Sequence, residues 1–109
     1  MRRHQQDRIF RAVADPTRRS ILERLHQHEL TVRELGEPFR ITQPSLSKHL
    51  GVLRHCGLIA ARRSGRHRYY RLEPEPLEEI AAWAAQFRYV RDPLGHVWRF
   101  TQIDKRKDT

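Results

Sequence analysis

The segment 42–58 carries the side chains whose types and spacing are most informative in this chain of 109 residues. It reads as one helix, capped by Thr42 and ended by Gly57. One side of this helix bears an apolar stripe of Leu46, Leu50 and Leu53. The other side begins with short polar and cationic groups, and the segment contains no acidic residue. These are the groups that read base edges and phosphates, so the segment predicts a helix that enters a DNA groove.

The candidate DNA contacts of this helix are Thr42, Gln43, Ser45, Ser47, Lys48 and His49. An amide such as Gln43 can bond bidentately to adenine, and Lys48 can reach guanine or a phosphate. The two serines are small enough to let the backbone approach base edges, and Thr42 would present the helix N-terminus to a phosphate. The alternative is a solvated helix face with ordinary polar residues. His49 borders the apolar stripe and could equally be a packed histidine.

After Gly57 the hydrophobic period changes to two, which is typical of β-strands. The runs 58–63 and 67–72 flank Ser64-Gly65-Arg66 and predict a β-hairpin over 58–72, which we call the wing. Its tip region contains basic residues and no acid, so we expect contacts with phosphates or the minor groove from Arg62, Arg63, Arg66 and Arg68. A solvated hairpin is the alternative.

Composition supports a polyanionic partner. The formal charge is +9, from 22 Lys+Arg against 13 Asp+Glu, and the length fits a single domain over 1–109. The single cysteine, Cys56, excludes an intrachain disulfide, and we expect it to be a small apolar filler. The chain shows no signal peptide, and its longest run without a polar side chain, 80–85, is too short to cross a bilayer. We therefore expect a cytoplasmic, nucleoid-associated protein with no membrane partner.

Apolar periodicity and caps predict the remaining elements. Asp15 and Pro16 open one helix, and Thr31 and Glu34 form a capping box for the next. Arg18 and Arg19 follow the Asp15 cap; a phosphate contact is one role, and a bond to neighbouring backbone is favoured for Arg18. The predicted helices are 5–14, 16–28, 32–38, 43–56 and, after the wing, about 76–91, followed by a C-terminal tail over 92–109.

The last predicted helix carries two adjacent apolar stripes, which is more than a surface helix needs for its own core. The excess predicts a second surface to bury, most simply against another copy of the chain. We expect the dimer interface to contain Ile9, Phe10, Val13, Trp83, Phe87, Val90 and Trp98.

Five blocks in the same order, 14–22, 30–35, 45–53, 57–59 and 65–72, resemble the ArsR/SmtB family of bacterial winged-helix repressors. The resemblance covers residues 8 to 90. It implies a mainly α fold with a small β-hairpin, a winged helix-turn-helix in the order α-α-α-α-β-β-α. It also implies a homodimer whose first and last helices form the interface and whose recognition helices read an inverted repeat in double-stranded DNA. Such proteins commonly repress their own operon and release DNA when an inducer binds; the inducer is not indicated.

The metal-sensing branches of that family use a Cys-x-Cys in the third helix or Asp/His pairs on the last helix. Here the third helix begins Val32-Arg-Glu-Leu35, and no histidine lies between Leu77 and Arg91. We therefore expect no metal and no cofactor. The sequence contains no nucleophile–base motif and no phosphate loop, so an enzyme is not expected. A winged-helix protein- or RNA-interaction module without operator specificity is the alternative to a regulator.

Overall fold

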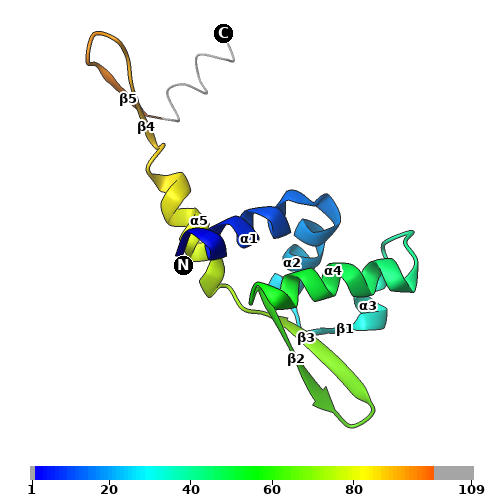
Figure 1. Cartoon of the computed structure of the whole chain (residues 1–109). Coiled ribbons are helices and arrows are strands. Elements are labelled where there is room, and N and C mark those ends of the chain that lie inside the picture. Colours follow the sequence, from blue (N-terminus) through cyan, green and yellow to red (C-terminus); the bar gives the residue numbers. More distant parts are fainter. Residues whose placement is uncertain (1, 100–109) are drawn as a thin grey trace.

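The computed structural model describes residues 2–99 as a helical body with a small sheet, followed by a projecting hairpin (Figure 1). Helices α1 to α4 precede the wing, as predicted. The elements are α1 (Arg2–Ala14), α2 (Pro16–Gln27), β1 (Leu30–Thr31), α3 (Val32–Gly36), α4 (Gln43–His55), β2 (Ile59–Ser64), β3 (His67–Leu72), α5 (Glu75–Ala85), β4 (Tyr89–Arg91) and β5 (Val97–Arg99).

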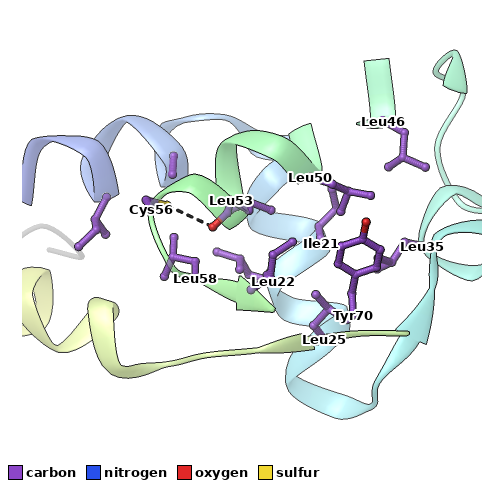
Figure 2. Packing of buried hydrophobic residues seen from close by; sticks show 13 residues of the cluster. Ile21, Leu22, Leu25, Leu35, Leu46, Leu50, Leu53, Cys56, Leu58 and Tyr70 are labelled. Atoms are coloured by element: carbon purple, nitrogen blue, oxygen red, sulfur yellow. Dashed lines mark hydrogen bonds between the residues drawn. The ribbon is translucent and has the colours of Figure 1, made fainter. Parts of the chain in front are cut away.

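The hydrophobic core lies between α2, α4 and the sheet (Figure 2). The apolar stripe predicted for α4 is confirmed, since Leu46, Leu50 and Leu53 are all buried. They pack with Ile21 of α2 and with Tyr70 of β3 in one cluster. Burying a leucine or isoleucine completely contributes about 1.5–3 kcal/mol, so this cluster is what holds α4 on the body.

Three side-chain caps set where the helices begin, and all three were predicted. The Asp15 carboxylate accepts from the Arg18 N–H at 3.0 Å and opens α2. Thr31 and Glu34 form the reciprocal capping box of α3. The Thr42 hydroxyl accepts from the Ser45 N–H at 3.2 Å and opens α4. Each cap satisfies a backbone donor that the first helical turn leaves unpaired.

Two glycines shape the helix-turn-helix formed by α3 and α4. A Cβ added at Gly36 would lie 2.9 Å from the Leu46 side chain, so a larger residue at the end of α3 would force this buried leucine to shift. Gly57 ends α4 with φ 76°, while Leu58 N–H donates to the Leu53 carbonyl at 3.0 Å. This is a Schellman motif, in which a left-handed residue after the helix satisfies its last carbonyls.

The wing belongs to a three-stranded antiparallel sheet in the order β1-β3-β2. Strands β2 and β3 pair from Ile59↔Leu72 to Ser64↔His67, which confirms the predicted hairpin. Strand β1 was not predicted, because two residues are too few to show an alternating pattern. It pairs Leu30 with Tyr70 and so joins the start of α3 to the wing.

The predicted boundaries are wrong at the C-terminal end. The helix expected over 76–91 ends at Ala85, and the expected tail contains strand β5, which pairs with β4. The Asp92 carboxylate explains the reversal: it accepts from the backbone N–H groups of Leu94 and His96 and closes a turn that a helix cannot contain. The remaining expected tail, 100–109, lies outside the described residues.

Smaller boundary differences occur at α1, which already begins at Arg2, and at α3, which ends at Gly36. No helix in the described part of the chain is long and apolar enough to span a membrane.

Candidate nucleic-acid interface

The solvent side of α4 carries most of the predicted contact residues. Gln43, Ser45, Ser47 and Lys48 are exposed, as is Thr42 at the cap, while the leucine stripe faces the core. The first turn of α4 contains no acidic residue. Its exposed face therefore combines hydrogen-bonding side chains, one cationic side chain and a helix N-terminus, which together suit a nucleic acid backbone and base edges.

His49 differs from the other candidates on α4, because it is only 19% exposed. Its Nδ1 lies 3.2 Å from Nη1 of Arg18 and 3.8 Å from Oδ2 of Asp15. The structure thus places His49 against the start of α2, which is the packed arrangement that the sequence left open. The pKa of Asp15 is lowered, chiefly by the hydrogen bond from the Arg18 backbone N–H.

Three wing arginines are exposed and close together. Arg63 on β2 and Arg68 on β3 lie directly opposite each other. Arg66 and Gly65 form the two-residue turn that joins these strands. Like charges in directly opposite strand positions destabilise a hairpin. A bound anion would remove this repulsion, so the arrangement favours phosphate as a partner of the wing. The Arg68 guanidinium also lies 5.9 Å from the Tyr70 ring centroid, so its stem runs along the sheet.

Arg62, the fourth predicted wing contact, is already engaged. Its guanidinium binds Glu29 in a bidentate arrangement, with Nε 3.0 Å from Oε1 and Nη2 2.8 Å from Oε2. It also lies 5.0 Å from the Tyr69 ring centroid. The hydrogen bond from Arg62 lowers the pKa of Glu29, so the carboxylate keeps its charge and neutralises Arg62. Arg62 is therefore less available to an anion than its three neighbours.

The structure adds Arg33 to this basic surface. Arg33 is exposed on α3 and lines a hollow of about 440 Å³ together with Arg66, His67 and Arg68. The sequence did not single it out, because the pairing of β1 with β3 that brings α3 beside the wing involves only two residues. The only hint in the sequence that Arg33 could join this surface was its positive charge within the capping box segment.

Arg18 and Arg19 of α2 bind the C-terminal end of α1. Arg18 donates to the carbonyls of Ala12 and Arg11 at 2.8 and 2.9 Å, and Arg19 donates to those of Val13 and Ala14 at 2.8 and 3.0 Å. Cationic donors suit the last carbonyls of a helix, where backbone acceptors are unpaired. The predicted backbone bond of Arg18 is confirmed.

Cys56 is buried at the end of α4, with its Sγ 3.5 Å from the Leu53 carbonyl oxygen (Figure 2). Burial raises the pKa of this thiol, so the reactive thiolate is disfavoured and Cys56 acts as a small apolar residue. Residues 2–99 contain no group of three or more His, Cys, Asp or Glu side chains that could hold a metal ion. His96 is paired with the Asp92 carboxylate, with Nδ1 3.0 Å from Oδ2.

Aromatic side chains of α1, of α5 and of the turn that follows α5 form a partly exposed apolar surface. The Phe10 and Trp83 ring centroids are 5.0 Å apart, and those of Trp83 and Phe87 are 4.8 Å apart. Trp83 is still 43% and Phe87 51% exposed, and α5 contains no buried residue. We call these three residues the aromatic patch.

The other residues predicted for a dimer interface divide into two groups. Ile9 is wholly buried inside a single chain, so its assignment to an interface is corrected: it belongs to the core. Val13 is partly buried and packs against that core. Val90 is exposed and pairs with Trp98 in the β4–β5 hairpin, where the Trp98 indole donates to Asp92 at 3.3 Å.

A helix-turn-helix followed by a basic β-hairpin defines the class of winged-helix DNA-binding domains, and comparisons with known proteins agree. Residues 15–61 match the family model described as bacterial regulatory protein, arsR family. The chain is 37% identical over 79 residues to the transcriptional repressor SdpR of Bacillus subtilis, covering 72% of this chain and 88% of SdpR. The chain therefore belongs to the ArsR family of transcriptional regulators.

Solved structures show the same relationship. The crystal structure of an ArsR family transcriptional regulator is 42% identical, with a TM-score of 0.71 over 76% of this chain and 86% of that chain. A possible ArsR-family regulator of Mycobacterium bovis, whose winged helix-turn-helix DNA-binding domain is homodimeric, is 28% identical. Its TM-score is 0.62 over 76% of this chain and 79% of that one. The winged-helix fold predicted from the sequence is confirmed.

Proposed function

We propose that the protein is a transcriptional repressor that binds an inverted-repeat operator as a homodimer. The observation that carries the proposal is the exposed, acid-free face of α4 next to the basic wing. Repression is supported by the similarity to SdpR, a transcriptional repressor. Dimer formation is supported by the similarity to the M. bovis domain, which is homodimeric. In this role the protein works in the cytoplasm at the nucleoid, without catalytic activity.

The aromatic patch supports the dimer. An interface between two identical chains is self-complementary, so one exposed apolar surface is enough to build it. Pairing through α1 and α5 would leave α4 and the wing of each subunit free. Two recognition helices would then enter successive major grooves about 34 Å apart, which is the geometry that an inverted repeat requires.

Within each subunit we assign distinct roles to the exposed residues. Gln43, Ser45, Ser47 and Lys48 contact base edges and adjacent phosphates from the N-terminal half of α4. The wing and α3 hold the DNA backbone through Arg33, Arg63, Arg66 and Arg68, with Arg62 in a lesser role because of Glu29.

The test is binding of the purified protein to its own upstream DNA and to a random duplex of equal length, with a footprint on the former. We expect a protected inverted repeat, and Gln43→Ala should cost about 1–3 kcal/mol on the operator alone. Arg66→Ala should weaken both duplexes alike and reduce the salt dependence. Equal affinity of the parent protein for every duplex would instead favour a winged-helix interaction module.

A further inference from the structure

One guanidinium group connects the recognition helix to the first helix of the chain. Arg18 holds the last carbonyls of α1 through Nε and Nη2, while its Nη1 lies 3.2 Å from Nδ1 of His49. His49 lies in the middle of α4, directly after the exposed Lys48 and one helical turn after the exposed Ser45. The orientation of α4 relative to α1 is therefore fixed by a single side chain as well as by the leucine stripe.

The chemistry of this contact determines the state of the histidine ring. Arginine stays protonated in proteins and can only donate, so Nδ1 of His49 must accept. A neutral ring then carries its proton on Nε2. Asp15 lies near the same edge of the ring, with its Oδ2 3.8 Å from Nδ1, and its carboxylate accepts a hydrogen bond from the Arg18 backbone N–H rather than from the ring.

Arg19 provides a natural control for this arrangement. It also binds carbonyls at the end of α1, with distances of 2.8 and 3.0 Å to Val13 and Ala14. Within the described residues no hydrogen bond or ion pair joins Arg19 to α4. The two arginines therefore share the capping of α1 and differ in the contact with His49.

We propose that Arg18 is a positioning residue for DNA reading, which sets the recognition helix against α1, and that His49 is its acceptor and touches no base. This inference rests on the proposed operator binding. Since α1 contributes Phe10 to the aromatic patch, the Arg18–His49 contact also fixes each recognition helix relative to the proposed dimer interface. An error in this angle would move the two helices away from the spacing of successive grooves, which changes operator binding more than random binding.

The experiment measures the ratio of operator affinity to random-duplex affinity, together with the urea unfolding of each variant. Arg18→Ala and His49→Phe should each reduce the ratio about tenfold, in the range of coupling found for contacting residues. Arg19→Ala should leave it unchanged, although it also removes donors to α1. An equal loss in Arg19→Ala would overturn the proposal, because capping of α1 alone would then explain the effect.

A double variant separates positioning from direct contact. If His49 acts only with Arg18, the pair Arg18→Ala/His49→Phe should lose no more of the ratio than either single change. Losses that multiply would overturn the proposal, since His49 would then contact DNA independently. Arg18→Lys covers the case in which the alanine variant does not fold: it keeps the charge but lacks the planar fork, so the ratio should still fall. A fully retained ratio in Arg18→Lys would indicate a simple phosphate contact and contradict the inference.

Histidine nitrogen NMR gives an independent readout on the free protein. In the parent protein and in Arg19→Ala, Nδ1 of His49 should be unprotonated and show the chemical shift of a hydrogen-bond acceptor, and this hydrogen-bond shift should be lost in Arg18→Ala. A parent spectrum with the proton on Nδ1 would overturn the proposal. If the parent protein shows no operator preference at all, the proposed function fails; if it does and the variants behave independently, only this inference fails.

Discussion

The part of the chain up to β3 and the part from α5 onward differ in what they bury. Within the part of the chain that the structure describes, the buried core residues lie between Ile9 and Tyr70, whereas the exposed large hydrophobic residues lie between Trp83 and Val97. The DNA-reading part thus closes its own core within one chain. The α5 part packs Leu77 and Ile80 partly against that core but leaves the aromatic patch exposed, and at the proposed interface a second copy would cover this patch.

The two parts also differ in charge. Helix α4 has no acid in its first turn, whereas α5 has Glu75 and Glu78 there. Acidic groups stabilise a helix N-terminus but repel a phosphate from it. The wing and the β4–β5 hairpin extend from opposite ends of the molecule (Figure 1). The distribution of charge therefore supports DNA binding by the α4 end and protein contact by the α5 end.

The largest expected effect comes from breaking the core. Leu53→Ala removes a fully buried side chain from α4 and should cost about 2–5 kcal/mol of unfolding free energy. The matched change Leu94→Ala, at a residue 84% exposed in the C-terminal hairpin, should cost less than about 0.5 kcal/mol. Urea denaturation at one protein concentration measures both. Similar costs for the two changes would contradict the division of the chain into a buried and an uncovered part.

Breaking the aromatic patch should affect assembly without unfolding the body. Phe87→Asp places a charge where the proposed interface is apolar, so we expect monomers by sedimentation and an unchanged helical circular dichroism signal. Leu94→Asp, outside the aromatic patch, is the control and should remain dimeric. A persistent Phe87→Asp dimer would place the interface elsewhere.

The Asp15 cap tests how a single side chain stabilises the part of the chain up to β3. Its lowered pKa means that the carboxylate stabilises the fold at pH values above its unfolded pKa of 3.8, and that this contribution is lost as pH falls through the lower folded value. Asp15→Ala should cost about 1 kcal/mol at neutral pH. Asp15→Asn should keep most of the cap but lose this share of the acid sensitivity. Unfolding at pH 7 and pH 3 tests both variants, and an Asn variant as acid-sensitive as the parent would contradict the assignment.

The smallest effect concerns the wing. Glu29→Gln removes the carboxylate that holds Arg62, and because the pair is exposed we expect little change in stability. The freed Arg62 should add about one phosphate contact, which steepens the salt dependence of DNA binding by about 0.9 in the log–log slope. Glu23→Gln, which changes an exposed acid on α2, is the control for net charge. Equal slopes for both variants would show that freeing Arg62 adds no phosphate contact, and would contradict the inference that Glu29 withholds Arg62 from DNA.

Sequence patterns predicted the features that depend on neighbouring residues. The caps at Asp15, Thr31 and Thr42 and the leucine stripe of α4 follow from spacings of a few residues, and all are present. Contacts between distant residues were not predictable in the same way. The pair Arg62–Glu29 joins residues 33 apart, and Arg18–His49 joins residues 31 apart.

The errors have a related cause. Ile9 was assigned to an interface because an apolar residue on α1 looks the same whether it faces its own core or a partner. The helix predicted through 91 fails because the apolar pattern continues past Ala85 while Asp92 closes a turn with Leu94 and His96. Periodicity reports that residues are apolar, but it does not report which backbone geometry brings them together.

Strand β1 has one more consequence, for how DNA release would work. Because Leu30 and Thr31 pair with Tyr70 and Tyr69, the wing and the helix-turn-helix share backbone hydrogen bonds and form one stiff unit within each subunit. The wing cannot swing outward without breaking that ladder. A signal that releases the operator would therefore need the least free energy if it changed the distance between the two DNA-binding units of a dimer. The helix-turn-helix and wing within each subunit would then keep their arrangement.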